Sequence, residues 1–149
     1  MDWYSRRFLK AALVWLGFGV VVGVAMTVRP AWLAYRPVHT HLNLLGFVAM
    51  TIFGVAYHVI PRFAGHPLHS PGLAGWHWWL ANAGLALLVT GFSLVGVAGA
   101  LPRWVMILGG SVSAVAAFLF IYNMWRTLDG RRRPAPGLRP LSVVEPPAR

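Results

Sequence analysis

The stretch RPVHTHLNLLGFV, residues 36–48, places two histidines at the mouth of a long apolar run. An ionisable side chain at the edge of a membrane span is costly, so it is by default a functional candidate. Successive residues of an α-helix are rotated by about 100°, so His39 and His41 point about 200° apart and serve two sites on opposite faces. Haem, a flat cofactor with two axial positions, fits that demand because its ligands come from different helices. The alternative is that the histidines cap the helix mouth and meet water or lipid headgroups.

The composition of the whole chain is typical of an integral membrane protein. Of its 149 residues, 58% are hydrophobic and 11% are charged, with thirteen Lys and Arg against three Asp and Glu. Basic residues at the ends of apolar spans set topology, so this charge does not indicate a nucleic-acid partner. The sequence contains no cysteine, which excludes disulfides, iron–sulfur clusters and covalently attached c-type haem.

Four apolar runs are long enough to cross a membrane, at about residues 8–28, 38–60, 76–97 and 103–125. We therefore predict an all-α, integral membrane four-helix bundle that assembles as a homo-oligomer. The bundle covers residues 1–128, and a Pro- and Arg-rich cytoplasmic tail over residues 129–149 is predicted to be disordered.

The distribution of basic residues predicts the orientation. Ten of the thirteen fall near the two termini and in the loop between spans two and three, while only Arg29, Arg36 and Arg103 fall on the other side. The positive-inside rule then places both termini in the cytoplasm of a prokaryotic-type inner membrane. His39 and His41 would lie toward the outer face.

Two segments of the chain resemble a known family. Residues 39–48, HTHLNLLGFV, followed by TIFGVAY at 51–57, resemble the tenth helix of subunit I of heme–copper oxidases, especially the C-type (cbb) branch. Residues 76–84, WHWWLANAG, resemble the start of the next helix. The chain as a whole resembles helices nine to twelve of that subunit, with the best similarity over about residues 36–100.

The resemblance implies specific roles for residues at the outer end. In the family, the first histidine of this pair binds the high-spin haem and the second binds the low-spin haem, which implies that His39 and His41 are axial ligands of haem b. Arg103 falls in the loop that matches the one whose arginines bind haem propionates in the family, and Arg36 lies beside the expected haem edge. The alternative is that both arginines set the membrane topology and bind lipid headgroups. Asn43 either contacts haem or quinol or hydrogen-bonds across helices.

RPVHT at residues 36–40 also resembles the Arg-Pro-x-His-Thr motif that supplies the family's other low-spin haem ligand. One stretch thus resembles two positions of an oxidase whose twelve helices form three pseudo-symmetric groups of four. The family's copper site, however, needs three further histidines on two other helices, and spans one and four contain none. The resemblance therefore does not extend to oxygen or nitric oxide reduction, and enzymatic activity stays an open question.

Four further histidines lie toward the predicted cytoplasmic side. His58 and His77, on successive antiparallel helices, can form a second site with His66 or His69 for copper, zinc or another haem. The alternative, which we favour, is that they hydrogen-bond to backbone or water in a wet loop.

These observations predict a b-type haem membrane protein for electron transfer or for gas or haem binding. We expect contact with lipid and with a quinol or respiratory-chain redox partner. Because one helix holds both histidines on opposite faces, we expect His39 of one chain and His41 of the next to share a haem in a trimer or dimer. The alternative is a haem-free accessory or assembly subunit of a respiratory oxidase. A metal transporter is a third candidate, but span two offers few polar residues for a path.

Overall fold

Four helical columns make up residues 1–95 and 99–130, the part of the chain that the computed structural model describes. The first column is α1 (Trp3–Val28). The second is composite, because η1 (Pro30–Tyr35), α2 (Arg36–His41), η2 (Leu42–Ala49) and α3 (Met50–Ala64) follow one another without a break. Helices α4 (Pro71–Ser93) and α5 (Leu101–Leu128) complete the fold. No β-strand occurs in these residues, so the predicted all-α class is confirmed.

Three of the columns are long and apolar enough to cross a membrane, namely Trp3–Val28, Pro30–Ala64 and Leu101–Leu128. Helix α4 has 23 residues, which is long enough, but it does not reach the same hydropathy. Its first turns carry Trp76, His77, Trp78 and Trp79, and Trp is a residue of the membrane interface rather than of its centre. The predicted third span is therefore a helix beside the others, and its crossing of the membrane stays a prediction.

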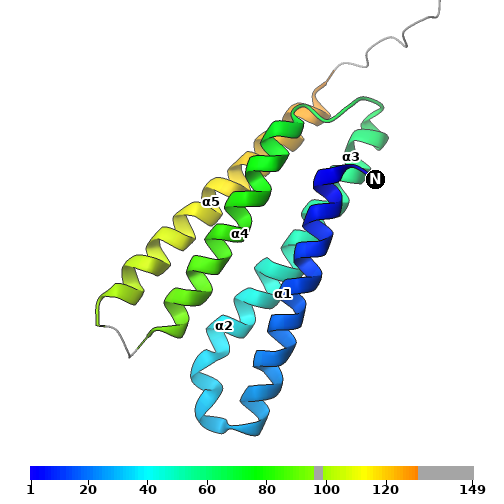
Figure 1. The fold of residues 1–149 in the computed structure, drawn as a ribbon. Helices are drawn as coiled ribbons and strands as arrows, with labels where there is room; N and C mark the ends of the chain where they lie inside the picture. The colour runs from blue at the N-terminus through cyan, green and yellow to red at the C-terminus, as the bar shows by residue number, and fades with distance from the viewer. Residues whose placement is uncertain (96–98, 131–149) are drawn as a thin grey trace, which may run out of the picture.

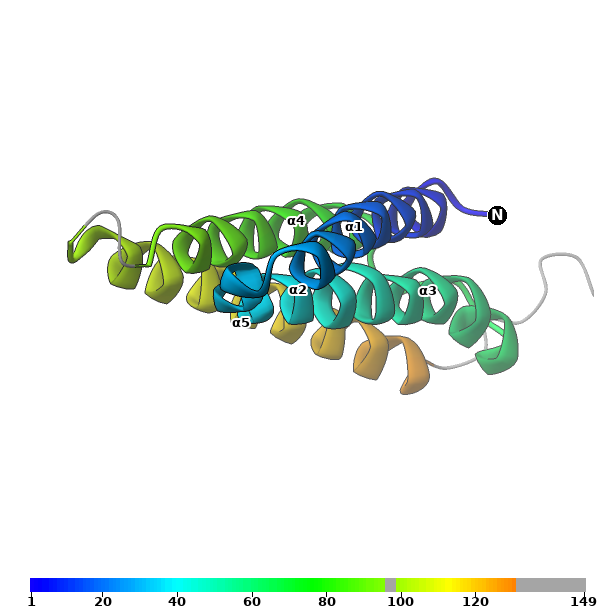
Figure 2. The ribbon, with the colours of Figure 1, turned by 90° about the horizontal axis from the view of Figure 1, so that it is seen from below.

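The columns pack in two layers. Helices α1 and α4 form one layer, and the composite column and α5 form the other (Figure 1; Figure 2). The start of α1, the end of α3 and the end of α5 lie at one end of the molecule, which we call the inner end. The end of α1, the start of α2, the end of α4 and the start of α5 lie at the opposite, outer end. The expected disordered tail lies almost wholly outside the described residues.

Glycine lets α4 and α5 pack backbone to backbone. A Cβ atom added at Gly109 would lie 2.6 Å from the backbone nitrogen of Leu88, and one added at Gly84 would lie 2.8 Å from the backbone nitrogen of Ser113. Neither position accepts a larger residue without separating the helices. In a membrane, such close packing takes the place of the hydrophobic effect as the force that holds helices together.

Aromatic side chains fill the core at the inner half of the bundle. The rings of Phe8 and Tyr57 are fully buried and stack at 5.7 Å between centroids. Phe53 and Phe120 pack against the same cluster, with their centroids 4.6 Å apart. Residues of α1, α3 and α5 therefore meet there, and the cluster fixes the inner ends of these helices relative to one another.

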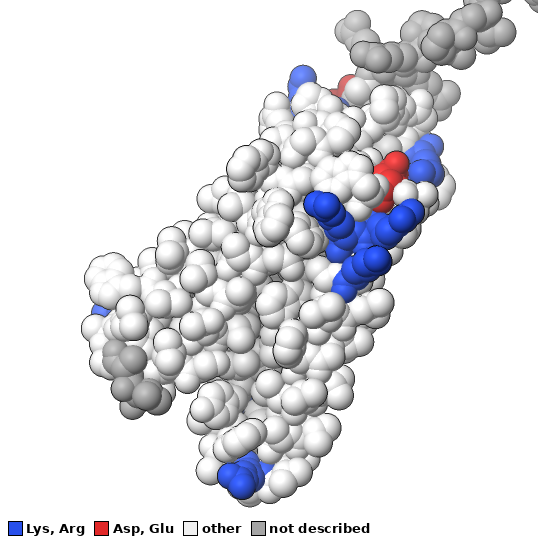
Figure 3. Space-filling model, viewed as in Figure 1, with Lys and Arg blue, Asp and Glu red and all other residues white. Residues whose placement is uncertain are grey.

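Charged residues concentrate at the ends of the molecule. On the face shown in Figure 3, Lys and Arg gather over the inner end, where acidic atoms are also visible, and further basic residues lie near the outer end. A wide uncharged belt separates them. This distribution is the one expected of a bundle whose middle faces lipid, because charges are strongly disfavoured at membrane depth.

Candidate functional site

His39 lies against α1. Its Nδ1 donates a hydrogen bond to the backbone oxygen of Gly19 over 2.9 Å. A Cβ added at Gly23 would lie 2.9 Å from Cε1 of the same ring. The two glycines, one turn apart on α1, therefore form a notch that the imidazole occupies. With Nδ1 bound to a carbonyl, the neutral ring keeps its lone pair on Nε2.

His41 faces a different neighbour. Its Nδ1 donates to the backbone oxygen of Pro37, one turn earlier in the same helix, over 2.8 Å. Its ring packs on Phe92 of α4, with the centroids 4.8 Å apart. The imidazole is only partly buried. Thus α2 presents one histidine to α1 and the other to α4, as the two-residue spacing predicts for a helix.

Both imidazoles have the chemistry of haem ligands. A histidine that binds a metal usually donates its other ring N–H to a carbonyl or carboxylate, which fixes the tautomer and the orientation of the ring. His39 and His41 both make that second bond through Nδ1, so Nε2 carries the lone pair in each ring, and in His39 the amide nitrogen of Asn43 lies 3.4 Å from it. The donor set present therefore fits axial ligation from two sides of α2.

Asn43 supports His39. Its side-chain amide donates to the backbone oxygen of His39 over 2.8 Å, and the same nitrogen lies 3.3 Å from Nδ1 and 3.4 Å from Nε2 of that ring. A Cβ at Gly19 would lie 2.8 Å from this amide, so the notch in α1 accommodates Asn43 as well. The hydrogen bonds of Asn43 thus stay within its own column, whereas the predicted bond crosses to another helix, and the contact with haem or quinol stays a prediction.

The helix widens immediately after His41. Residues Leu42–Ala49 form η2, a π-helical segment of eight residues. Such segments are rare and occur frequently at functional sites. Gly46 lies within η2 and is buried against α1, where a Cβ would come 2.5 Å from Cβ of Trp15. Apart from the position of Gly46, no pattern in the sequence indicates this segment.

Arg36 and Arg103 lie at the outer end, as the sequence predicts, but they begin different helices. Arg36 opens α2 and Arg103 lies in the first turn of α5. Both side chains are exposed. They are thus accessible to an anionic group such as a propionate or a lipid headgroup. Their exposure therefore does not distinguish propionate binding from headgroup binding.

The four inner-end histidines have four different neighbours. His58 Nδ1 lies 3.6 Å from a carboxylate oxygen of Asp2, whereas His77 hydrogen-bonds with Tyr57. The ring of His66 lies beside Gly130, because a Cβ atom added at Gly130 would lie 2.7 Å from Cε1 of His66. The ring of His69 packs on Tyr122. Residues 1–95 and 99–130 hold no group of three or more His, Asp or Glu that can bind a metal. His58 and His77 thus have different partners in this structure, and a joint metal site of the two stays a prediction.

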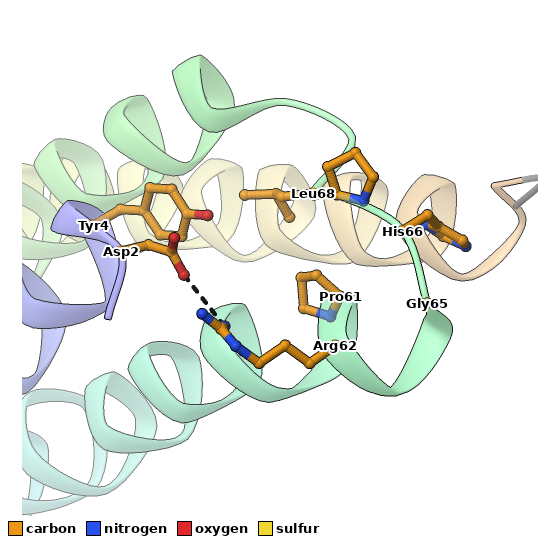
Figure 4. A pocket seen from close by; sticks show the side chains of 8 residues that line it. Asp2, Tyr4, Pro61, Arg62, Gly65, His66 and Leu68 are labelled. Carbon is orange, nitrogen blue, oxygen red and sulfur yellow. Dashed lines mark hydrogen bonds and ion pairs between the residues drawn. The ribbon is translucent and has the colours of Figure 1, made fainter. Parts of the chain in front are cut away.

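An ion pair closes the inner end of the bundle. Arg62 at the end of α3 donates to Asp2 over 3.3 Å, across an open hollow of about 420 Å³ that Tyr4, Pro61 and His66 also line (Figure 4). Burial raises the pKa of the Asp2 carboxyl, but the hydrogen bond and the charge of Arg62 outweigh burial, so the pKa lies below its usual value. This pair ties the start of α1 to the end of α3, and sequence reasoning missed it.

Sequence comparison identifies the family. The family model described as cytochrome c and quinol oxidase polypeptide I matches residues 3–131, which is most of the chain. The chain belongs to the cytochrome c and quinol oxidase polypeptide I family. The resemblance to subunit I of heme–copper oxidases is thus confirmed.

Curated members of the polypeptide I family are similar over most of this chain. The cbb3-type cytochrome c oxidase subunit CcoN1 of Stutzerimonas stutzeri is 26% identical over 156 residues, covering 85% of this chain and 33% of the relative. Cytochrome c oxidase subunit 1 of Thermus thermophilus is 28% identical over 178 residues, covering 97% of this chain and 31% of the relative. The chain therefore spans about a third of the length of these relatives.

Proposed function

We propose that the chain is a b-type haem-binding integral membrane protein in which His39 and His41 are the axial ligands. The observation that carries this proposal is the anchoring of both imidazoles. Each Nδ1 is bound to a backbone carbonyl, so each Nε2 is left for iron, and the two rings face different helices. Membership of the oxidase polypeptide I family supports the choice of haem over another metal.

The orientation in the membrane is part of the proposal. All four columns cross the bilayer, with both termini in the cytoplasm and the histidine pair toward the outside. Helix α4 does so despite its polar first turns, because its Trp side chains lie at the inner end, where the membrane interface would be. The gathering of basic residues at the same end supports the cytoplasmic assignment.

The haem is shared between copies of the chain. His39 lies in the notch of its own α1 and His41 lies on α4, so one protomer offers only one imidazole to each side of α2. A closed trimer or dimer supplies the missing ligand from the next chain. The outward faces of α1 and α5 carry exposed apolar side chains that suit contact with lipid or with a neighbour, among them Leu13, Phe18, Val21, Ile107 and Phe118.

Haem b, held by His39 and His41, would supply a one-electron redox couple or a site for a diatomic gas. The chain's own residues hold and orient the two imidazoles. Arg36 and Arg103 can pair with propionates at the outer end, because arginine binds carboxylates in a bidentate manner. Electron transfer with a quinol or a respiratory-chain partner is the role that this arrangement fits best, and gas or haem binding follows from the same site.

The test is the molar mass of the purified protein in detergent, measured by light scattering together with the content of extractable haem per chain. The proposal predicts an oligomer with about one haem b per chain. A haem-loaded monomer would contradict the shared site, and a haem-free protein would contradict the proposal as a whole.

The second candidate is a haem-free accessory or assembly subunit of a respiratory oxidase. It is favoured by the exposed apolar side chains of α1 and α5, which offer a surface to a larger subunit. In this case the purified protein is colourless and co-purifies with an oxidase subunit.

A further inference from the structure

His77 has an unused ring nitrogen inside the bundle. The residue is 0% exposed, and its Nδ1 lies 3.0 Å from the hydroxyl of Tyr57. The ring is enclosed by Phe8, Phe53 and Phe120. Its Nε2 is buried and has no hydrogen-bond partner among residues 1–95 and 99–130. A buried polar atom without a partner is rare in folded proteins and requires an explanation.

The hydrogen bond with Tyr57 fixes what His77 can offer. The hydroxyl of Tyr57 and Nδ1 of His77 share one hydrogen bond, and we assign the tautomer in which the phenol donates to Nδ1. The neutral imidazole then carries its own proton on Nε2. A charged ring is disfavoured, since neither carboxylate of the described residues lies in this aromatic cluster: Asp2 precedes α1 and Asp129 follows α5. His77 therefore presents an N–H donor.

A second unpartnered polar atom lines the same space. A cavity between η2, α3, α4 and α5 is bordered by His77 and by Ser113, whose hydroxyl is buried and unpartnered within the described residues. The cavity offers about 70 Å³ in which the centre of a water molecule can lie. Its remaining lining is apolar and is made by Leu45, Ala49, Met50, Phe53, Ala81, Leu85, Ala116 and Ala117.

We propose that this cavity is a binding site for a small neutral hydrogen-bonding molecule, water, held between Nε2–H of His77 and the hydroxyl of Ser113. Both protein atoms otherwise lose a hydrogen bond on burial, which is unfavourable. A water needs only roughly 10–15 Å³ of such space and two or more polar partners, and the cavity meets both conditions. The apolar lining excludes ions, and Ser113, a hydroxyl that both donates and accepts, completes the site.

Proton-detected solid-state NMR of the full chain in lipid bilayers tests this site directly, with histidine labelled with nitrogen-15. A cross-peak between Nε2–H of His77 and water is expected in the parent protein. Ala117→Leu fills the cavity and should abolish the cross-peak. Ala114→Leu is the matched control, because Ala114 is exposed and does not line the cavity, so the cross-peak should persist.

A protonated Nε2 without a water cross-peak in the parent protein would overturn the proposal, and so would a cross-peak that survives in Ala117→Leu. The Nδ1 signal of His77, which reports the bond to Tyr57, shows whether each variant keeps the native packing. Ser113→Ala adds no bulk and serves if Ala117→Leu does not fold. It should shorten the residence time of the water about fivefold, as expected for the loss of one ordinary hydrogen bond. An unchanged residence time would remove Ser113 from the site.

Discussion

The two histidine regions of this molecule differ in what holds the imidazoles. At the outer end, His39 and His41 are bound to backbone carbonyls and are only partly buried. At the inner end, His77 is bound to a side chain, Tyr57, and is closed in by aromatic rings. A ring held by the backbone through Nδ1 can offer Nε2 to a large cofactor at the helix surface. A ring enclosed on all sides can serve only a small ligand.

This difference explains why six histidines do not make six ligands. The outer pair lies on opposite faces of α2, immediately before the π-helical segment η2, whereas the inner four each contact a different neighbour. The predictions below separate cofactor binding at the outer end from stability at the inner end.

The largest effect is expected from removing the ligands themselves. His39→Ala and His41→Ala should each lower haem content about tenfold or more, since even loss of a supporting residue costs 10- to 100-fold in metal affinity. The measurement is haem per chain after purification. His66→Ala is the matched control at the inner end and should keep full haem content. Retention of haem in both alanine variants would end the ligand assignment.

A smaller loss is expected when the notch in α1 is filled. Gly23→Ala places a Cβ 2.9 Å from Cε1 of His39, so the ring must shift and its bond to Gly19 weakens. Haem affinity should fall about fivefold, the equivalent of one ordinary hydrogen bond. Gly17→Ala is the control on the same helix, because a Cβ there meets no atom within 4 Å. Equal haem titrations for the two variants would show that the notch does not position His39.

A substitution at the inner end should change the stability of the fold and leave the haem content unchanged. Tyr57→Phe removes the donor to His77 Nδ1 and leaves a second buried nitrogen without a partner. We expect a loss of about 1–3 kcal/mol in unfolding free energy with haem content unchanged. Thermal unfolding in the same detergent, with haem quantified before heating, provides both numbers. A haem loss comparable to that of His41→Ala would mean that the two regions are coupled.

Much of this arrangement follows from sequence pattern, and the rest depends on packing. Apolar length identifies α1, the composite column and α5, and two-residue spacing is enough to place His39 and His41 on different faces. The burial of His77 could not be predicted in the same way. It arises because Phe8 of α1, Tyr57 of α3 and Phe120 of α5 all pack against the ring of His77. These residues are far apart in the sequence, so no local sequence pattern predicts the contact. From the sequence alone, a histidine among tryptophans indicates an aromatic belt at the membrane interface and not a buried side chain.

The smallest effect concerns pH at the ion pair of Asp2 and Arg62. The pKa of Asp2 is lowered in the folded protein, so the pair stabilises the fold above the ordinary pKa of aspartate, about 3.9. That contribution is lost as pH falls through the lower, folded-state pKa. Because Asp2 is exposed to solvent, Asp2→Asn should cost only a few tenths of a kcal/mol at pH 7 and nothing at the acidic limit. Unfolding midpoints of both proteins from pH 7 to pH 3 should therefore converge; a constant gap would contradict the linkage.

The most direct test of the central claim is the absorption spectrum of the purified protein, oxidised and then reduced with dithionite. Ligation by His39 and His41 predicts a red protein with the spectrum of low-spin, six-coordinate b-type haem in both states, and loss of that spectrum when either histidine is replaced by alanine. A colourless protein, or a low-spin spectrum unchanged in both variants, would contradict the account.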